Sequence, residues 1–176
     1  MCKFKSAIVL KNGDILHNDF TDSHEDLIDL FGLVDNGKEA FVRIEYTTDK
    51  RKDVIEFYQL IVDEQSIPYW FKEIKDSVEE RMKTLVSGMI IKENQKIIVG
   101  RCVILSPGVI IDKVRHCIIQ EMRENSHVNV MRENSQVNEM RENSQVNEMR
   151  ENSHVNMMRE NSQVNEMRET TSGSNV

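Results

Sequence analysis

The sequence predicts an α+β domain followed by a short C-terminal β-solenoid, because two parts of the chain follow different patterns. Up to residue 99, short strand-like segments alternate with two helical segments. Over residues 122–169, the unit Met-Arg-Glu-Asn-Ser-Gln-Val-Asn-Glu recurs every nine residues with few changes. Residues 100–121 are expected to be an adapter that forms a first, degenerate coil, and residues 170–176 a disordered tail.

In the N-terminal domain, the first predicted elements are a hairpin and a helix. Lys5–Leu10 is strand-like, and Asn12-Gly13 indicates a two-residue turn into a returning strand at Asp14–His17. Ser23 then has the place of a helix N-cap, and Gly32 is expected to end that helix.

Two strands and a longer helix come next. Phe41–Tyr46 alternates as a half-buried strand does, and Phe57–Asp63 is the following strand candidate. Apolar residues then recur every three or four positions, which predicts a helix that ends near Gly88. The segments Met89–Ile91 and Lys96–Val99 predict a last strand-turn-strand, which gives the order ββ-α-ββ-α-ββ.

The nine-residue period decides how the second part folds. In an α-helix nine residues make about two and a half turns, so consecutive units would place their Val on opposite sides and form no apolar stripe. Disorder is the second alternative, because the segment is polar and repetitive. We favour a solenoid in which two units make one coil of about 18 residues. The residues expected to fill its interior are Met122, Met131, Met140, Met149, Met158 and Met167 with Val128, Val137, Val146, Val155 and Val164.

Other residues of the unit also suit such a coil. The small Ser of each unit fits beside the interior Val and Met. The Asn before it, for example Asn125, tolerates the left-handed backbone of a corner, and stacked Asn amides can hydrogen-bond from coil to coil. Upstream, Ile111-Asp-Lys-Val114-Arg and Ile119-Gln-Glu-Met122-Arg match the frame Val-x-x-Met-Arg, which makes them degenerate units.

The repeat resembles pentapeptide-repeat and related β-helix proteins, and more specifically a group of proteins of gut bacteria and their phages with no assigned function. The likeness rests on Met1–Ser6, on Asp22–Leu27 and on the tandem units from Asn125 onward. It differs from true pentapeptide repeats in its nine-residue period. The resemblance implies a solenoid that binds a macromolecule, and it carries over no catalytic motif.

Composition argues against several classes of protein. The chain has 23 Lys and Arg against 30 Asp and Glu, a net charge of -7, which disfavours general nucleic-acid binding. Its three Cys form no CxxC pair, as expected for free thiols in a reducing cytoplasm. The sequence has neither a signal-peptide core nor the roughly 20 apolar residues of a membrane span. We therefore expect a soluble, cytoplasmic protein with no membrane association.

The surface of the repeat is the first candidate site. Because its frame is nearly invariant, the positions that vary are expected to face solvent or a partner. Neighbouring Arg and Glu can offset each other, which favours a self-compensating surface over mimicry of a nucleic-acid backbone. A last coil without a cap exposes unpaired backbone, so two chains are expected to pair end to end as a homo-oligomer. The candidate interaction residues are His127, Gln136, Gln145, His154, Gln163, Arg132, Arg141, Arg150, Glu139 and Glu148.

The N-terminal domain offers a second candidate. Asp22 and His24 lie in a cluster of carboxylates that a metal or acid–base site can use, although a helix capped by Ser23 explains the same residues. Tyr69 and Trp70 offer an aromatic binding surface, although aromatic residues at a helix start usually pack into the core. With no phosphate-binding glycine loop, nucleophile elbow or zinc-binding spacing, we expect no catalytic residue, metal or cofactor.

These observations predict a non-enzymatic protein that interacts with macromolecules. With the resemblance, the expected partner is a host protein or protein complex, which a phage-encoded or mobile-element-encoded factor binds and inhibits in the host cytoplasm. Three alternatives stay open. They are an oligomer that sequesters a small ligand such as a nucleotide, a structural protein that self-assembles through the repeat, and an enzyme that uses Asp22, His24 and Asp26.

Overall fold

The computed structural model describes residues 5–34 and 40–168. The chain divides into two compact units, Met1–Gly88 and Met89–Val176. The division comes after Gly88, whereas the sequence predicts it near residue 99, because strands expected to close the N-terminal domain belong to the solenoid. The tail predicted at residues 170–176 lies outside the described residues. In the described part of the chain, no helix has the length and apolar character needed to cross a membrane.

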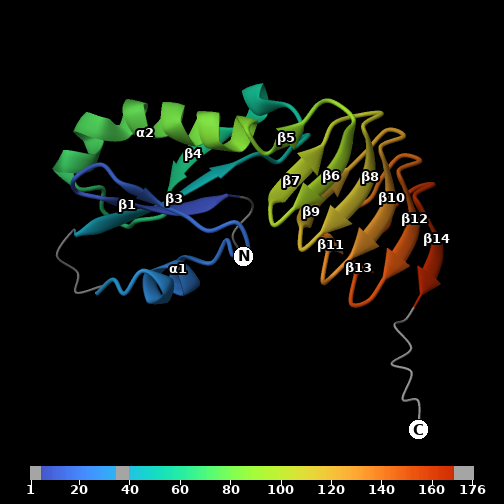
Figure 1. Cartoon of the computed structure of the whole chain (residues 1–176). Coiled ribbons are helices and arrows are strands. Elements are labelled where there is room, and N and C mark those ends of the chain that lie inside the picture. Colours follow the sequence, from blue (N-terminus) through green and yellow to red (C-terminus); the bar gives the residue numbers. More distant parts are fainter. Residues whose placement is uncertain (1–4, 35–39, 169–176) are drawn as a thin grey trace, which may run out of the picture. The chain divides into compact units, whose positions relative to one another are not determined.

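The N-terminal unit is a four-stranded antiparallel sheet with one helix on each face (Figure 1). Its elements are β1 (Ser6–Leu10), β2 (Ile15–Leu16), α1 (His24–Leu30), β3 (Phe41–Thr47), the 3-10 helix η1 (Ile55–Phe57), β4 (Gln59–Val62) and α2 (Tyr69–Ser87). The strand order is β2-β1-β3-β4, so the central strand β3 pairs with both β1 and β4. The predicted order ββ-α-ββ-α is confirmed for this part.

Each helix buries one apolar side. On the α1 face of the sheet, Ile8, Leu27 and Phe41 form a buried cluster. Successive residues of β3 point to opposite faces, so the same strand also supplies buried residues to the other face. The helix α2 ends at Gly88 as predicted, and its buried residues recur at helical spacing. They are Phe71, Val78, Met82 and Val86.

Local hydrogen bonds explain where the first elements begin and end. Ser23 caps α1 as predicted, since the backbone N–H of Asp26 donates to Ser23 Oγ at 3.3 Å. The turn between β1 and β2 is longer than the predicted two-residue turn. Within it, Leu10 N donates to Asp14 O at 2.9 Å and Gly13 takes a φ of 88°. The side chain of Asn12 accepts from Asp14 N at 3.1 Å, which stabilises this wider loop.

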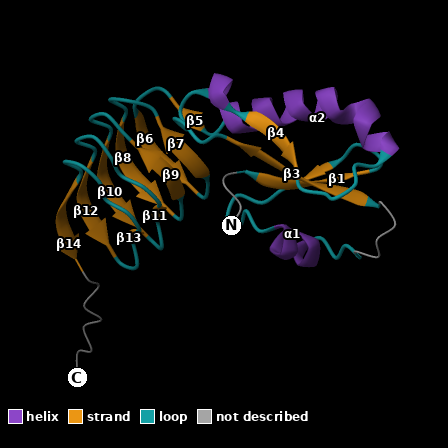
Figure 2. Cartoon of the chain, turned by 180° about the vertical axis from the view of Figure 1, so that it is seen from behind, coloured by secondary structure: helices purple, strands orange, loops and turns teal. Residues whose placement is uncertain are grey.

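The second unit is a β-solenoid of about five turns, with roughly 17 residues per turn (Figure 2). Its strands are β5 (Ile90–Ile91), β6 (Gln95–Val99), β7 (Cys102–Leu105), β8 (Ile110–Arg115), β9 (Ile118–Met122), β10 (His127–Arg132), β11 (Gln136–Val137), β12 (Gln145–Arg150), β13 (His154–Val155) and β14 (Gln163–Arg168). They form two parallel sheets, of order β14-β12-β10-β8-β6 and β13-β11-β9-β7-β5. The strands β5 and β6, predicted to be a strand-turn-strand of the N-terminal domain, thus begin different sheets of the solenoid.

The number of residues per turn grows along the solenoid. Ile98 pairs with Val114, sixteen residues later, and Val114 pairs with Met131, seventeen residues later. Met131 pairs with Met149 and Met149 with Met167, in each case eighteen residues later. The degenerate units therefore stack in the predicted frame. Ile98 occupies the Met position of that frame in a further turn, which lies upstream of the units predicted from the sequence.

Stacked apolar side chains fill the interior of the solenoid. The Val and Met of the central repeats are buried, as the sequence predicts. The Ser residues of these repeats are also buried, beside the Val and Met. The buried repeat residues are Val128, Met131, Val137, Met140, Val146 and Met149 with Ser126, Ser135 and Ser144.

The corners between strands are formed by the segment Arg-Glu-Asn-Ser. In one of them, Ser135 N donates to Arg132 O at 3.3 Å, while Glu133 and Asn134 between them have φ of 56° and 60°. Positive φ at both central positions is characteristic of a type I′ turn. The predicted Asn corner is confirmed. The Glu beside it shares the left-handed backbone, which costs such a residue about 1–2 kcal/mol and was not predicted.

Candidate functional site

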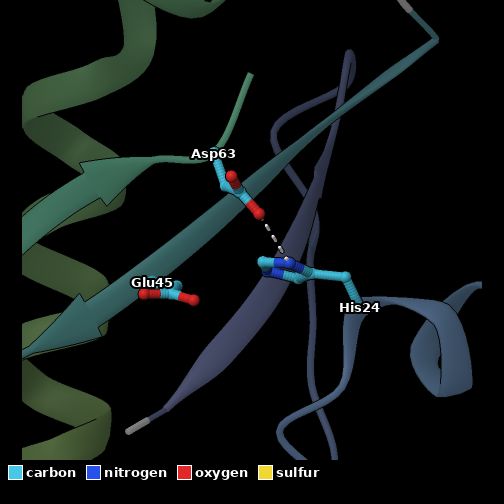
Figure 3. A group of neighbouring side chains, drawn as sticks. All are labelled: His24, Glu45 and Asp63. Carbon is cyan, nitrogen blue, oxygen red and sulfur yellow. Dashed lines mark ion pairs between the residues drawn. The ribbon is translucent and has the colours of Figure 1, made fainter. Parts of the chain in front are cut away.

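Three side chains of metal-ligand type lie together on the α1 face of the N-terminal sheet (Figure 3). His24 begins α1, Glu45 is on β3, and Asp63 directly follows β4. Their ligand atoms all lie within 4.8 Å of one another. His24 is buried and Glu45 is half-buried, whereas the Asp63 side chain is 62% exposed, so the cluster opens toward solvent.

Strand pairing and one hydrogen bond place these three side chains. Glu45 pairs with Ile61, and Asp63 N donates to Arg43 O at 2.9 Å, so Glu45 and Asp63 are diagonal neighbours on one face. His24 Nε2 lies 3.0 Å from the carbonyl oxygen of Ile44, and Nδ1 lies 3.4 Å from Asp63 Oδ2. The cluster joins residues from three elements, which is why the local sequence around His24 did not reveal it.

The carboxylates that neighbour His24 in the sequence have other partners. Asp19 and Asp22 lie 3.7 Å and 3.9 Å from the ammonium of the buried Lys5. The same ammonium donates to the carbonyl oxygen of Asn18. Asp22 therefore stabilises a buried charge, and of the predicted pair Asp22 and His24, His24 joins the three-residue cluster.

The aromatic residues at the start of α2 divide between surface and core. Phe71 is buried, and Trp70 packs edge-on against it with ring centroids 5.9 Å apart. Tyr69 is 75% exposed. The expectation that aromatic residues at this helix start pack into the core is wrong for Tyr69, which presents its ring at the surface, whereas the neighbouring Phe71 does pack there.

One position of the repeat varies between His and Gln, and this residue begins each strand and forms a ladder in each sheet. The position is occupied by His127, Gln136, Gln145, His154 and Gln163. In one sheet His127 pairs with Gln145, and Gln145 pairs with Gln163. In the other sheet Gln136 pairs with His154. His127 and His154 therefore lie in different sheets, and the structure does not bring them together.

The predicted compensation between Arg and Glu is seen along the repeat. Glu139 contacts Arg141 at 2.5 Å within its own unit and Arg159 at 3.2 Å from the next turn. The hydrogen bond from Arg150 lowers the pKa of Glu148, which also contacts Arg168 at 3.1 Å. Through such contacts the positive charge of Arg and the negative charge of Glu largely offset each other along the repeat.

The position two residues before each Arg also varies between units, and at one of these positions the Glu that pairs with the Arg is missing. Val130 occupies the place that Glu139 and Glu148 have in later units. Two residues on, Arg132 therefore has no Glu at this position of its own unit, although Glu148 of the next turn is close enough for the charge of Arg132 to lower its pKa. Of the three predicted arginines, Arg132 thus lacks the partner Glu that Arg141 and Arg150 have in their own units.

The Asn that follows each Val forms amide ladders that the sequence did not predict. These Asn side chains donate from one turn to the next in both sheets. Among the described residues, the corner Asn, where the ladder is expected, shows one such bond, from Asn152 Nδ2 to Asn134 Oδ1 at 3.0 Å. The ladders on the strands are Asn165 to Asn147 at 2.9 Å, Asn147 to Asn129 at 3.0 Å and Asn129 to Asp112 at 3.1 Å in one sheet, with Asn156 to Asn138 at 3.0 Å and Asn138 to Gln120 at 2.8 Å in the other.

The last described turn leaves its apolar side chains uncovered. Met131 is fully buried, but Met167, two turns further along the same sheet, is 72% exposed. In the other sheet Met140 is buried, while Met158, which bridges to it from the next turn, is 45% exposed. The strands β13 and β14 form the edges of their sheets, and within residues 5–34 and 40–168 no further strand pairs with them.

No protein-family profile, curated protein or solved structure matches the chain at a significant level. The resemblance to pentapeptide-repeat proteins of gut bacteria and their phages stays a prediction.

Proposed function

We propose that the chain is a non-enzymatic interaction protein and that its first partner is a second copy of itself. In this proposal the nine-residue unit is the building block of the solenoid, and two units make each regular turn. The outer edge of the last described turn is the recognition surface. The observation that carries the proposal is the exposure of Met158 and Met167, at positions that are buried in the preceding turns.

Burial of stacked Val and Met is what holds one turn to the next. In the last described turn, Val155 and Val164 pack against the core but stay partly exposed. In the same turn, no described strand pairs with the outer edges of β13 and β14. An apolar surface framed by unpaired strand edges is one that another β-structured chain can extend.

The sequence of β14 suits pairing with a second β14 about a two-fold axis. Such an axis makes the two strands antiparallel, and each contact then occurs twice. With the axis beside Met167, Glu166 of one copy lies opposite Arg168 of the other, and the two Met167 side chains meet at the centre. Glu166 and Arg168 form a 2.7 Å pair within one chain, so the exchange of partners leaves no charge unpaired. Each cross-strand charge pair contributes about 0.2–1 kcal/mol.

The wider proposal, that a phage-encoded or mobile-element-encoded chain binds and inhibits a host protein complex, depends on the resemblance. The lateral ladders of His, Gln, Arg and Glu would supply that contact surface. Because Arg and Glu pair with each other there, the flank is not a uniform acidic array, which disfavours mimicry of nucleic acid.

Sedimentation velocity of the full chain over a series of concentrations tests the self-association. We expect a dimer at micromolar concentration and a monomer for Met167→Glu, which places a charge in the apolar centre of the interface. Gln163→Glu adds the same charge at the outward-facing start of the same strand and is the matched control, expected to dimerise like wild type. A wild-type chain that stays monomeric throughout the series contradicts the proposal.

A deletion tests whether the end surface or the flank of the solenoid carries recognition. Removing residues 134–151 takes out eighteen residues, the spacing between paired residues of successive regular turns, and keeps β14 at the edge. The shortened chain is expected to dimerise as the full chain does. If it instead becomes monomeric while still folded, the flank of the solenoid carries recognition.

A further inference from the structure

The hydrogen bonds of His24 determine which of its ring nitrogens is protonated. The carbonyl oxygen of Ile44 can only accept, so Nε2, 3.0 Å away, carries the proton. In the neutral imidazole Nδ1 then has a free lone pair, which faces Asp63 Oδ2 at 3.4 Å. The carboxylate of Glu45 lies within 4.8 Å of both. In this neutral form three electron-pair donors converge, an arrangement that a bound cation stabilises.

The contact with Ile44 is also the kind of outer contact that metal-binding histidines usually make. Such a histidine usually donates its second ring N–H to a backbone carbonyl or carboxylate, which sets both tautomer and ring orientation. Ile44 is fully buried on the central strand β3, so its carbonyl is held by the sheet. Glu45 is the next residue of that strand, so the sheet positions two parts of the site together.

The distances suit a tetrahedral ion. Zn²⁺ binds His nitrogen and carboxylate oxygen at about 2.0–2.2 Å, and tetrahedral geometry then separates neighbouring ligand atoms by about 3.4 Å. His24 Nδ1 and Asp63 Oδ2 are 3.4 Å apart. The carboxylate of Glu45, half-buried on its strand, lies within 4.8 Å of both atoms. A nitrogen with two oxygens suits Zn²⁺ better than Ca²⁺ or Mg²⁺, which take oxygen ligands.

We propose that His24, Glu45 and Asp63 bind one divalent transition-metal ion of the Zn²⁺ class. Three protein ligands leave the fourth position for water or a small ligand. The site lies within the N-terminal unit, so it does not depend on the self-association proposed for the solenoid. It differs from the expectation, drawn from local sequence alone, that the chain binds no metal.

The test is titration of the full chain, without an affinity tag, with Zn²⁺ by calorimetry and with Co²⁺ by visible absorption. We expect one ion per chain and the intense visible bands of four-coordinate Co²⁺. Asp63→Asn and Glu45→Gln should each weaken binding at least about tenfold. Asp29→Asn removes an exposed carboxylate of α1 outside the cluster and is the matched control, expected to bind like wild type.

The side chain of Asp63 is largely exposed, so the Asp63→Asn chain is expected to fold, and circular dichroism checks this. The proposal is overturned if the wild-type chain takes up no Zn²⁺ from a large excess, or if Asp63→Asn and Asp29→Asn bind it equally. A proton on Nδ1 of His24, paired with Asp63, would then stabilise the cluster, and nitrogen NMR of the imidazole would show it.

Discussion

Replacing Met131 with Ala tests whether the stacked Met and Val hold the solenoid together. Met131 is fully buried between Val114 of the preceding turn and Met149 of the next. Loss of such a side chain costs about 2–5 kcal/mol, from lost burial and from the cavity left behind. Met167→Ala is the matched control, since it changes the same position of the same sheet two turns on.

The expected cost at Met167 is much smaller. Because Met167 is 72% exposed, little more than a quarter of the side chain is buried. Full burial of Met contributes about 1.5–3 kcal/mol, so the loss should be about 0.4–0.8 kcal/mol, with no cavity because water reaches the site.

Urea unfolding at a concentration where the chain is monomeric measures both free energies. Far-UV circular dichroism follows the secondary structure of both units, and the fluorescence of Trp70, the single Trp, follows the N-terminal unit, so a circular-dichroism transition without a fluorescence change reports the solenoid. Equal losses for the two variants, or a loss below about 1 kcal/mol for Met131→Ala, would refute the reasoning.

Three further predictions concern single side chains. Asn147→Ala breaks two ladder hydrogen bonds and Asn165→Ala one. At about 0.5–1.5 kcal/mol per bond, the first should cost about twice as much in urea unfolding, and equal costs would contradict the ladder. Burial, and then the charge of Lys5, lower the pKa of His17, so the unfolded chain takes up this proton at higher pH than the folded chain. The contribution of His17 to stability is therefore complete above about pH 6.5 and is lost as the pH falls through the folded-state value; His17→Gln should flatten the stability profile in that range. Burial raises the pKa of the Cys117 thiol, which should resist alkylation at neutral pH until the chain unfolds, as peptide mass spectrometry would show.

The interior of the solenoid was predictable because an apolar residue that recurs at a fixed spacing indicates a position that is buried in every turn. A residue that recurs unchanged in every unit, such as Val128 or Met131, is one that each turn places in the same environment. The same logic predicts the corner at Asn134, because a left-handed position selects Asn. The upstream turns were harder to detect, since Ile98 and its neighbours keep the apolar frame and lose the rest of the unit.

Identical sequences with different structures mark the limit of such prediction. Gln-Val-Asn-Glu-Met-Arg forms the six-residue strand β12, yet the same six residues at 136–141 form the two-residue strand β11 and a single bridge at Met140. The residues themselves cannot encode this difference, so it comes from the turns on which they stack. In the sheet of β11, the pairing of β7 with β9 has an irregular register between Val103 and Leu105.

The cluster around His24 was not predictable for a related reason. Its members are brought together by the register of β3 against β4 and by the hydrogen bond from His24 to the strand. Neither is visible in a local pattern. The sequence pointed to carboxylates near His24 in the chain, whereas the sheet brings Glu45 and Asp63, which are distant in the chain.

Near-identical units create an ambiguity of register, which the degenerate turns remove. A shift by eighteen residues would again set Val on Val and Met on Met, so the interior of the regular turns does not distinguish one alignment from another. The upstream turns do, because Ile98, Val114 and Met131 pair at spacings of sixteen and seventeen residues that the regular units do not contain. The contact of Arg115 with Glu133 also joins the upstream turn to the regular turns. Stacking thus has one defined starting point, from which each turn is a template for the next. The number of regular turns can then change by whole turns without loss of register, which is why the chain shortened by eighteen residues is expected to keep its edge strand and its self-association.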